Sequence, residues 1–353
     1  MVNHSEEAVR VHAAARARRS VRLLGNVLVL LVAVAVALLL LEAAMRALGM
    51  LDPVIYRPDP VFGYEPRPNQ SATRLGIPIY IDDIGLRDNE DASTLLRSKT
   101  RILVIGNSVT YGGSRIHQRD LFTEVLEREL RMRGGDVKVL NAGVNGYSVS
   151  QMIARTRTLL APTKPMVLVL FAVRADFLRP PVQFIPEGNV AYPLHRPASA
   201  LVDFLKLALN HLEGRHPFLP SGLRRLIASP PHYSPPYDTT HVIDTHLAAF
   251  QDFLRTAWEP SGRSRDDIVV FFSPIKADLV ENRRNPNADL VQRFAAMHIR
   301  AYDLQKEYYE ATVARGRQVD DYYFDTVHYL EPGHALAGRT VAAYLLRDGF
   351  TAP

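Results

Sequence analysis

A short apolar run that stops at a glycine constrains this chain more than any other feature. Residues Arg101–Ile105 have the composition of a β-strand, Gly106 ends the run, and Ser108 follows two positions later. A strand that ends in this way places the Ser108 hydroxyl at the carboxyl edge of a sheet, and ligands of open α/β sheets bind at that edge. The stretch around Ser108 therefore predicts a functional site.

The residues after Ser108 alternate between apolar runs and segments with helical spacing. The runs Val137–Leu140, Met166–Phe171 and Asp267–Phe272 are almost free of charge, which is typical of parallel strands buried on both faces. This alternation predicts a doubly wound α/β domain. The remaining expected elements are a strand over Ile299–Tyr302, helices over Asp120–Arg133, Ser148–Leu160, His241–Trp258, Pro286–Met297 and Leu304–Arg315, and a last helix that begins near Pro332.

An uncharged run of 19 residues, Leu23–Leu41, lies between Arg22 and Glu42. This length can span a bilayer as a helix, and the run is apolar on all sides, unlike an amphipathic core helix. No clear cleavage site follows it, which favours a membrane anchor over a cleaved signal peptide. The arginines before the run predict a cytoplasmic amino terminus and a single-pass protein of the cytoplasmic (inner) membrane, with the folded domain on the periplasmic side.

These features divide the chain into a basic cytoplasmic tail (1–22), a transmembrane anchor (23–48), a proline-rich stalk and edge segment (49–98) and a main domain (99–353). Residues 52–70 hold five prolines and predict an extended stalk that lies on the domain or leads to it. Residues 179–240 interrupt the alternation and predict an insertion. This insertion is either a lid over the site or a surface excursion.

Composition excludes several classes of function. The chain of 353 residues has no cysteine, which excludes disulfides, thiolate zinc sites and a cysteine nucleophile. Its net charge is +5, but residues 1–46 hold six arginines against three glutamates, so the remaining residues carry only +2. No nucleic-acid partner is expected from so small an excess. Since His241 and His246 form no ligand pattern with carboxylates, neither a metal nor a cofactor is expected.

A serine nucleophile needs a base within hydrogen-bond reach and a group that orients the base. Asp325 and His328 stand near the carboxyl end at a spacing that lets one turn carry both side chains on the same side. The backbone N–H groups of Ser108 and Gly143 follow two neighbouring strands and can bind a developing oxyanion. The sequence thus offers a nucleophile, a base, an orienting carboxylate and two oxyanion donors.

Three blocks stand out in residues 101–348: Gly106–Gly112, Asn141–Gly146 around Gly143, and Asp325–His328 followed by Glu331–His334. They resemble those of the SGNH (GDSL) hydrolase family, with Asn107 in place of the aspartate in the first block. The resemblance implies a flavodoxin-like three-layer α/β/α sandwich with a parallel sheet and a triad of Ser108, His328 and Asp325. It also implies an esterase, a deacetylase or an acyltransferase that acts on acylated envelope glycans. We expect His334 itself at the surface, in the first turn of the last helix.

The third block of the family is different here. When the chain is aligned on Asp176, Ala175 stands where the family has an asparagine that donates to the oxyanion. The methyl group of alanine cannot donate a hydrogen bond, and the loss of one such donor typically costs about a hundredfold or more in rate. Arg174 and Asn145 are the candidates to replace it; otherwise the activity is weak or absent.

Two functions are consistent with these features. The first is a membrane-anchored serine esterase or O-acyltransferase that acts on an acylated, for example acetylated, carbohydrate or on a small ester. A transferase of this kind would need a partner membrane protein that supplies the acyl donor. The second is a non-catalytic SGNH-like module that binds a glycan or a membrane assembly. The acyl group, the polymer and the oligomeric state are not specified by the sequence.

Overall fold

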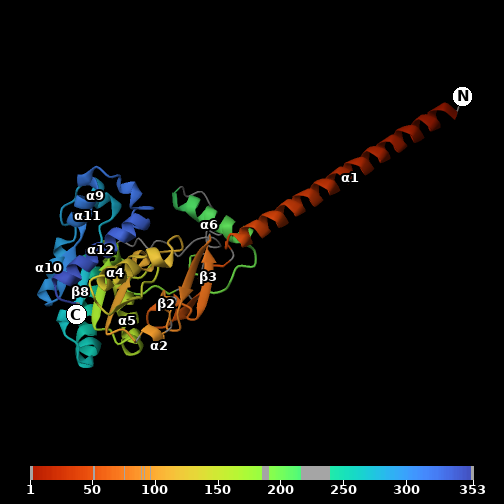
Figure 1. The fold of residues 1–353 in the computed structure, drawn as a ribbon. Coiled ribbons are helices and arrows are strands. Elements are labelled where there is room, and N and C mark those ends of the chain that lie inside the picture. Colours follow the sequence, from red (N-terminus) through yellow and green to blue (C-terminus); the bar gives the residue numbers. More distant parts are fainter. Residues whose placement is uncertain are drawn as a thin grey trace.

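The computed structural model shows a long helix that projects from a folded body (Figure 1). It describes residues 3–50, 52–74, 76–88, 90, 92–95, 97–184, 191–215 and 239–350. The helix, α1 (Asn3–Ala47), contains the segment Arg22–Ala47, whose most apolar window has a mean hydropathy of 3.0 and no residue buried inside the structure. By length and composition this segment can cross a membrane, and a signal sequence would meet the same criteria.

A five-stranded parallel sheet forms the centre of the body, with the strand order β6-β5-β7-β8-β9. The chain starts in β5, moves outward to β6, and then returns to the other side of β5 for the remaining strands. This order is the flavodoxin-like one, and its switch point lies between β5 and β7, where folds of this kind bind ligands at the carboxyl ends of the strands. The strands are β5 (Thr100–Gly106), β6 (Val137–Asn141), β7 (Val167–Ala172), β8 (Ile268–Phe272) and β9 (Arg300–Asp303).

Helices cover both faces of this sheet, because alternate strand residues point to opposite sides. Leu103 and Ile105 of β5 belong to one apolar cluster, and Ile102 and Val104 belong to the other. The first cluster is covered by α5 (Val149–Thr163), α8 (Thr239–Phe253) and α10 (Ala288–Ala296); the second by α4 (Phe122–Arg131), α9 (Lys276–Val280), α11 (Gln305–Ala311) and α12 (Glu331–Arg347). The predicted α/β/α sandwich is therefore confirmed.

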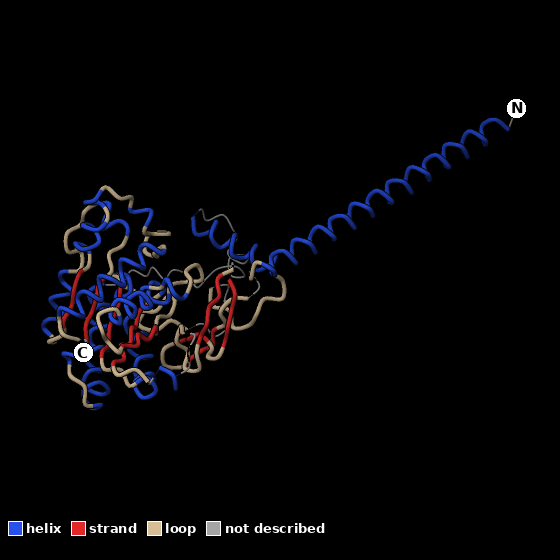
Figure 2. Tube along the Cα trace, viewed as in Figure 1, coloured by secondary structure: helices blue, strands red, loops and turns tan. Residues whose placement is uncertain are grey.

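The elements expected from the sequence are present, with ends shifted by a few residues. The largest internal difference lies after α8, where residues Leu254–Trp258 form one π-helical turn instead of continuing the α-helix. Figure 2 shows how helices surround the red strands of the central sheet. A short helix, α2 (Ala92–Leu95), precedes β5.

The proline-rich segment lies on the body as part of two antiparallel β-hairpins. Tyr56 and Tyr64 from this segment are buried in the same cluster as one face of the sheet. Prolines cannot donate ladder hydrogen bonds, and these strands are accordingly short pairs outside the main sheet. The hairpins consist of β1 (Tyr56–Asp59) with β2 (Gly63–Pro66), and β3 (Gln70–Arg74) with β4 (Ile77–Ile81).

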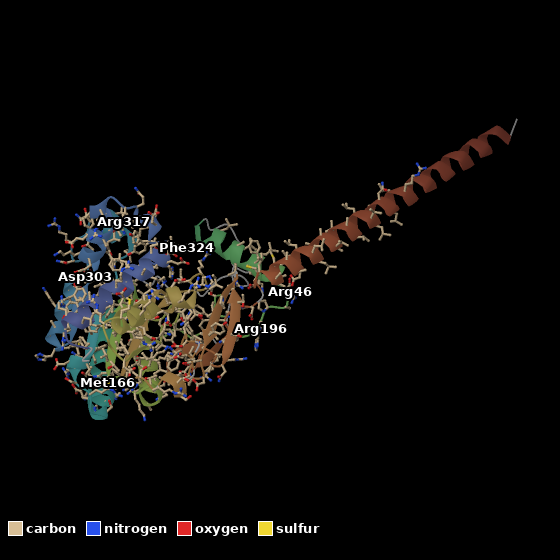
Figure 3. All side chains as sticks on the ribbon, in the orientation of Figure 1. Arg46, Met166, Arg196, Asp303, Arg317 and Phe324 are labelled. Atoms are coloured by element: carbon tan, nitrogen blue, oxygen red, sulfur yellow. The ribbon has the colours of Figure 1, made fainter. Side chains whose placement is uncertain are left out.

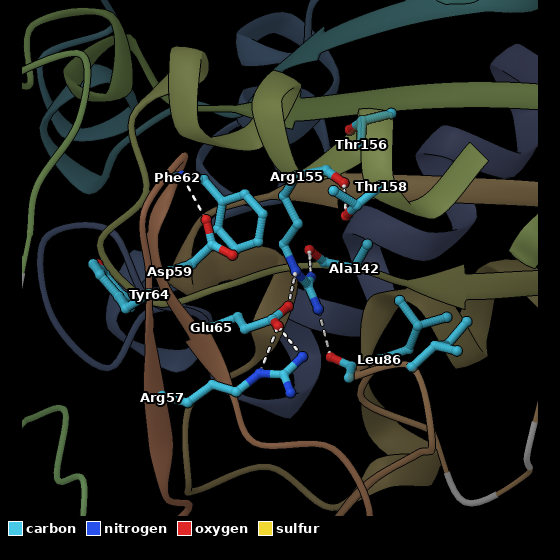
Figure 4. Close-up of polar contacts among 12 residues, drawn as sticks. Arg57, Asp59, Phe62, Tyr64, Glu65, Leu86, Ala142, Arg155, Thr156 and Thr158 are labelled. Atoms are coloured by element: carbon cyan, nitrogen blue, oxygen red, sulfur yellow. Dashed lines mark hydrogen bonds and ion pairs between the residues drawn. The ribbon is translucent and has the colours of Figure 1, made fainter. Parts of the chain in front are cut away.

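Arg155 of α5 connects the first hairpin to the loop that follows β6 (Figure 4). Its buried guanidinium donates to the Ala142 carbonyl at 2.8 Å and to the Gly85 carbonyl at 2.6 Å, and its Nε lies 3.5 Å from the Glu65 carboxylate. Because Ala142 directly precedes Gly143, this contact positions one of the expected oxyanion donors.

The described part of the insertion includes helix α6 (Ala200–Arg215), which packs against the end of α1. Residues 185–190 and 216–238 of the insertion lie outside the described residues. The lid and the surface excursion both stay predictions for this insertion.

Candidate active site

Ser108 lies at the first position of a short helix, α3 (Ser108–Tyr111), directly after β5. Asn107 caps this helix, since its side-chain oxygen accepts a hydrogen bond from the Val109 N–H at 2.7 Å. The turn needs glycine at position 106, because a Cβ there would lie 2.0 Å from Thr110 Oγ1 and 2.6 Å from the Phe171 carbonyl oxygen. Strand, glycine and cap together present the Ser108 hydroxyl at the sheet edge.

Asp325 and His328 share one tight turn before α12. Oxygen Oδ1 of Asp325 accepts hydrogen bonds from the backbone N–H groups of Val327 and His328, at 2.9 and 2.8 Å. Oxygen Oδ2 lies 2.7 Å from His328 Nδ1. An isolated bridge between Tyr323 and Tyr329 closes the base of this loop. The spacing therefore places carboxylate and imidazole side by side, as expected from the sequence.

The fold brings this turn to Ser108 across 220 positions of sequence, with Ser108 Oγ at 2.7 Å from His328 Nε2. When Nδ1–H donates to Asp325, the lone pair on Nε2 faces the serine hydroxyl and can accept its proton. Burial opposes the charge on Asp325, but the hydrogen bonds from His328 and Val327 outweigh it and lower the pKa of Asp325 to about 2. Asp325 is thus ionised at neutral pH.

Gly143 packs directly against α3. A Cβ at this position would lie 2.3 Å from the Tyr111 backbone nitrogen, so only glycine allows the two backbones to approach so closely. Its own N–H donates to Asn141 Oδ1 at 3.0 Å. The Ser108 N–H makes no hydrogen bond within the described part of the chain. Of the two backbone donors expected for the oxyanion, Ser108 is free and Gly143 is engaged.

The two candidate side-chain donors also have partners. Arg174 forms a two-pronged ion pair with Asp289 of α10, at 2.7 and 3.0 Å, and this hydrogen bonding raises the pKa of Arg174. Asn145 donates from Nδ2 to the Tyr56 hydroxyl at 3.0 Å. Ala175 is exposed. In this conformation both Arg174 and Asn145 donate to side chains outside the triad.

Two residues to which the sequence analysis gave no role support the nucleophile. Arg87 is fully buried and donates to the carbonyls of Tyr111 and Gly113, both at 2.5 Å, and of Ile116 at 2.8 Å. It thereby fixes the loop that follows α3. Asn141 supports the same region from β6, because its Nδ2 donates to the Thr110 carbonyl at 2.9 Å. Arg87 lies in what reads as a simple turn, so no local pattern reveals its role.

The expectation that His334 lies at the surface is wrong. The first turn of α12 faces α4, and the buried His334 accepts a hydrogen bond at Nδ1 from the Phe122 N–H, at 3.2 Å. Burial is the main cause that lowers the pKa of His334 to about 3, with smaller effects from Arg87 and His328. His334 is therefore neutral, and it helps to join the two helices that flank the site.

Among residues that the structure describes, no group of three or more histidines, aspartates or glutamates is placed to hold a metal ion. The chemistry available at the site is that of its side chains and backbone amides: a hydroxyl, an imidazole, an ionised carboxylate and at least one free N–H. This set can form and break an acyl ester.

No protein-family model and no curated protein matches the sequence. Solved structures do match, and several are GDSL lipolytic proteins or esterases. A lipolytic protein of the G-D-S-L family from Veillonella parvula is 16% identical, with 70% of this chain and 99% of that one covered and a TM-score of 0.41. An acetylxylan esterase from Geobacillus stearothermophilus is 15% identical, with 71% and 95% covered and a TM-score of 0.41.

A lipase/acylhydrolase from Enterococcus faecalis is 16% identical, with 72% of this chain and 98% of that one covered and a TM-score of 0.38. At such identities and TM-scores these matches describe what the chain resembles. Its function is inferred from its own site.

Proposed function

We propose that this chain is a membrane-anchored serine esterase in which Ser108 is the nucleophile, His328 the base and Asp325 the group that orients it. The observation that carries the proposal is the continuous hydrogen-bonded chain from Asp325 through His328 to Ser108, with 2.7 Å at each side-chain contact. A structural serine needs no such relay, and the triad side chains of His328 and Asp325 are each 39% exposed, so an ester can reach them.

The proposed reaction has two halves. Ser108 Oγ bonds to the acyl carbon while its proton moves to His328 Nε2, and the protonated imidazole then gives this proton to the departing alkoxide. Water next attacks the acyl carbon and gives a proton to the same imidazole, which returns it to Ser108 Oγ as the acyl–Oγ bond breaks and the carboxylic acid leaves. If a sugar hydroxyl takes the place of water, the acyl group is transferred instead of hydrolysed.

The site has few free hydrogen-bond donors for the oxyanion. The Ser108 N–H is available to it, whereas the Gly143 N–H would first have to leave Asn141 Oδ1. Arg174 would have to leave Asp289, and Asn145 would have to leave Tyr56. With one free donor we expect slow turnover, since each missing donor typically costs about a hundredfold or more.

The proposed substrate class, an acylated envelope or exported glycan, follows from the resemblance to anchored members of the SGNH family. The proposed location follows from α1: a single span of the cytoplasmic membrane, with the amino terminus in the cytoplasm and the body on the periplasmic side. As a transferase, the protein would receive its acyl group from a partner membrane protein.

A second candidate function, a non-catalytic glycan-binding or assembly module, is favoured by the alanine at position 175 and the engaged Gly143 amide. Hydrolysis of p-nitrophenyl acetate by the full chain in detergent separates the two. The esterase proposal predicts that Ser108→Ala lowers the rate by about a thousandfold or more, down to the background. Equal rates for wild type and Ser108→Ala would favour the module. Adding an acceptor sugar then shows whether acetate is released or transferred.

A further inference from the structure

Helix α6 buries a charged residue and exposes several large apolar ones. Its charged first-turn residue, Asp203, is only 7% exposed and pairs with Arg74 at 2.8 Å. Val202 and Leu205 are each 48% exposed, and Phe204 and Leu212 are exposed as well. A helix that rests on a soluble body normally turns its apolar side inward. The outward face of α6 therefore suits an apolar environment.

This helix begins at the end of α1. The Glu42 carboxylate of α1 accepts hydrogen bonds from Ser199 Oγ at 2.9 Å and from the backbone N–H groups of Ala200 and Leu201, at 3.0 and 2.9 Å. Arg46 reinforces the junction, with Glu42 at 2.7 Å and the Ala198 carbonyl at 3.0 Å. Glu42 thus caps a helix that is more than 150 residues away in the sequence.

The position of this junction along α1 matters. Glu42 is the first charged residue after the uncharged run Leu23–Leu41, so it marks the level at which a spanning helix would leave the hydrocarbon core. Figure 1 shows α6 running sideways from the end of α1, and Figure 3 labels Arg46 at this point. A helix that starts at this level and runs across α1 lies along the membrane surface.

Polar contacts also connect the folded body to the junction of α1 and α6. Arg74 donates to the Met50 carbonyl at 2.5 Å as well as to Asp203. Asp52 accepts a hydrogen bond from the Thr73 N–H at 2.9 Å and pairs with Arg196 at 2.9 Å. The end of α1, the second hairpin and the start of α6 are therefore connected to one another, so α6 cannot swing freely around the anchor.

We propose that α6 is an interfacial helix that inserts its exposed apolar side chains, Val202, Phe204, Leu205 and Leu212, into the outer surface of the same bilayer that α1 spans. The inference rests on the proposed membrane span. Lipid is favoured over a protein partner because the exposed surface of α1 is apolar up to Leu41, and the face of α6 continues it from Glu42. The exposed Lys206 can reach lipid phosphates.

Site-directed spin labelling tests this proposal directly, because the chain has no cysteine of its own. The variants Val202→Cys and Leu205→Cys are labelled in the full chain and reconstituted into bilayers of phosphatidylethanolamine and phosphatidylglycerol. Oxygen concentrates in the bilayer, whereas a neutral nickel chelate stays in the water, so the two collision rates show where each label lies. We expect the ratio of oxygen collisions to chelate collisions to be several-fold higher for both labels than for a label at Met132→Cys. Met132 is an apolar residue at the end of α4 that is 66% exposed.

A label at Leu31→Cys, in the middle of the uncharged run, tests the membrane span of α1 separately from the interfacial position of α6. If the Leu31 label is in lipid while the α6 labels are as accessible to the chelate as the Met132 label, the span stands and the interfacial helix is disproved. Labels on α6 that are shielded from both reagents would mean that protein covers the face, which also overturns the proposal. A Leu31 label in water would overturn the span and the interfacial helix together. Circular dichroism of each variant verifies folding.

Discussion

The side-chain amide of Asn107 donates to both carboxylate oxygens of Asp176, at 2.7 and 2.8 Å, and both residues are buried. Asp176 also accepts a hydrogen bond from the Val173 N–H at 2.9 Å, and burial raises its pKa to about 6. Asn107 is the cap of α3 and directly precedes Ser108. The short turn that follows β7 thus holds Asn107, the residue that caps the helix of the nucleophile.

Asn107→Asp should destabilise the protein, because it would put two carboxylates at hydrogen-bond distance in a buried site. We expect a loss of about 3 kcal/mol or more at pH 8, and less at pH 5. The sign follows from linkage: like charges raise the folded-state pKa above its unfolded value, so stability is lost as the pH rises. Urea unfolding in detergent at the two pH values measures this difference.

The control is the double variant Asn107→Asp with Asp176→Asn, in which the carboxylate and the amide change places. It should recover most of the lost stability, since one donor and one acceptor again face each other. If Asn107→Asp alone were as stable as wild type at pH 8, the contact between Asn107 and Asp176 would not hold Asn107 in position.

Asp325→Asn should lower kcat/KM about a thousandfold to ten-thousandfold with little effect on folding. The amide would still accept the backbone N–H groups through its oxygen, but its NH2 group would donate to His328 Nδ1. The imidazole would then carry its proton on Nε2 and could not accept one from Ser108. Asp320→Asn is the matched control, because this exposed carboxylate precedes the same loop and pairs with Lys276. Similar losses for both variants would contradict the assigned role.

Ala175→Asn should raise activity, since it restores a side-chain donor where the third block of the SGNH family carries one. We expect kcat to rise by about a hundredfold with KM nearly unchanged, because the new hydrogen bond forms mainly in the transition state. Ala175→Asp, which has the same shape and no donor when ionised, should give no increase. If neither variant differs from wild type, position 175 does not face the oxyanion.

His334→Asn should make the protein less sensitive to acid. The pKa of His334 is lowered from 6.5 to about 3, so the unfolded chain binds one more proton in this window and stability falls as the pH falls. The slope from this one group approaches 1.4 kcal/mol per pH unit. Asparagine can still accept from the Phe122 N–H but does not titrate. Parallel pH profiles for unfolding of wild type and variant would contradict this account.

Much of the fold follows from local signals in the sequence. The continuous apolar run Val167–Ala172 and the helical spacing of apolar residues in α4 are local patterns. The structure has a strand and a helix at these positions. The nucleophile, base and orienting residue stand in short motifs, so their identities also follow from the sequence. Whether these three residues come together depends on the order of the strands in the sheet. The alternation of elements restricts this order but does not determine it.

The remaining features depend on contacts between distant residues. Arg174 could reach an oxyanion by its position alone, but Asp289, over a hundred residues later, binds it instead. Proline-rich composition predicts a stalk that lies on the domain or leads to it, but it does not reveal that Tyr56 and Tyr64 pack into the core of the body. The burial of His334 depends on which face of α12 meets α4, and one turn of sequence does not show this face.

The most direct test of the central claim is covalent labelling of the full chain with a fluorophosphonate, followed by mass spectrometry of the labelled peptide. The account predicts a label on Ser108 that is absent in Ser108→Ala. The label should persist in Ser150→Ala, although Ser150 Oγ also lies 2.7 Å from an imidazole nitrogen, that of the buried His246. A label on another residue, or one that persists in Ser108→Ala, would contradict a serine esterase built on Asp325, His328 and Ser108.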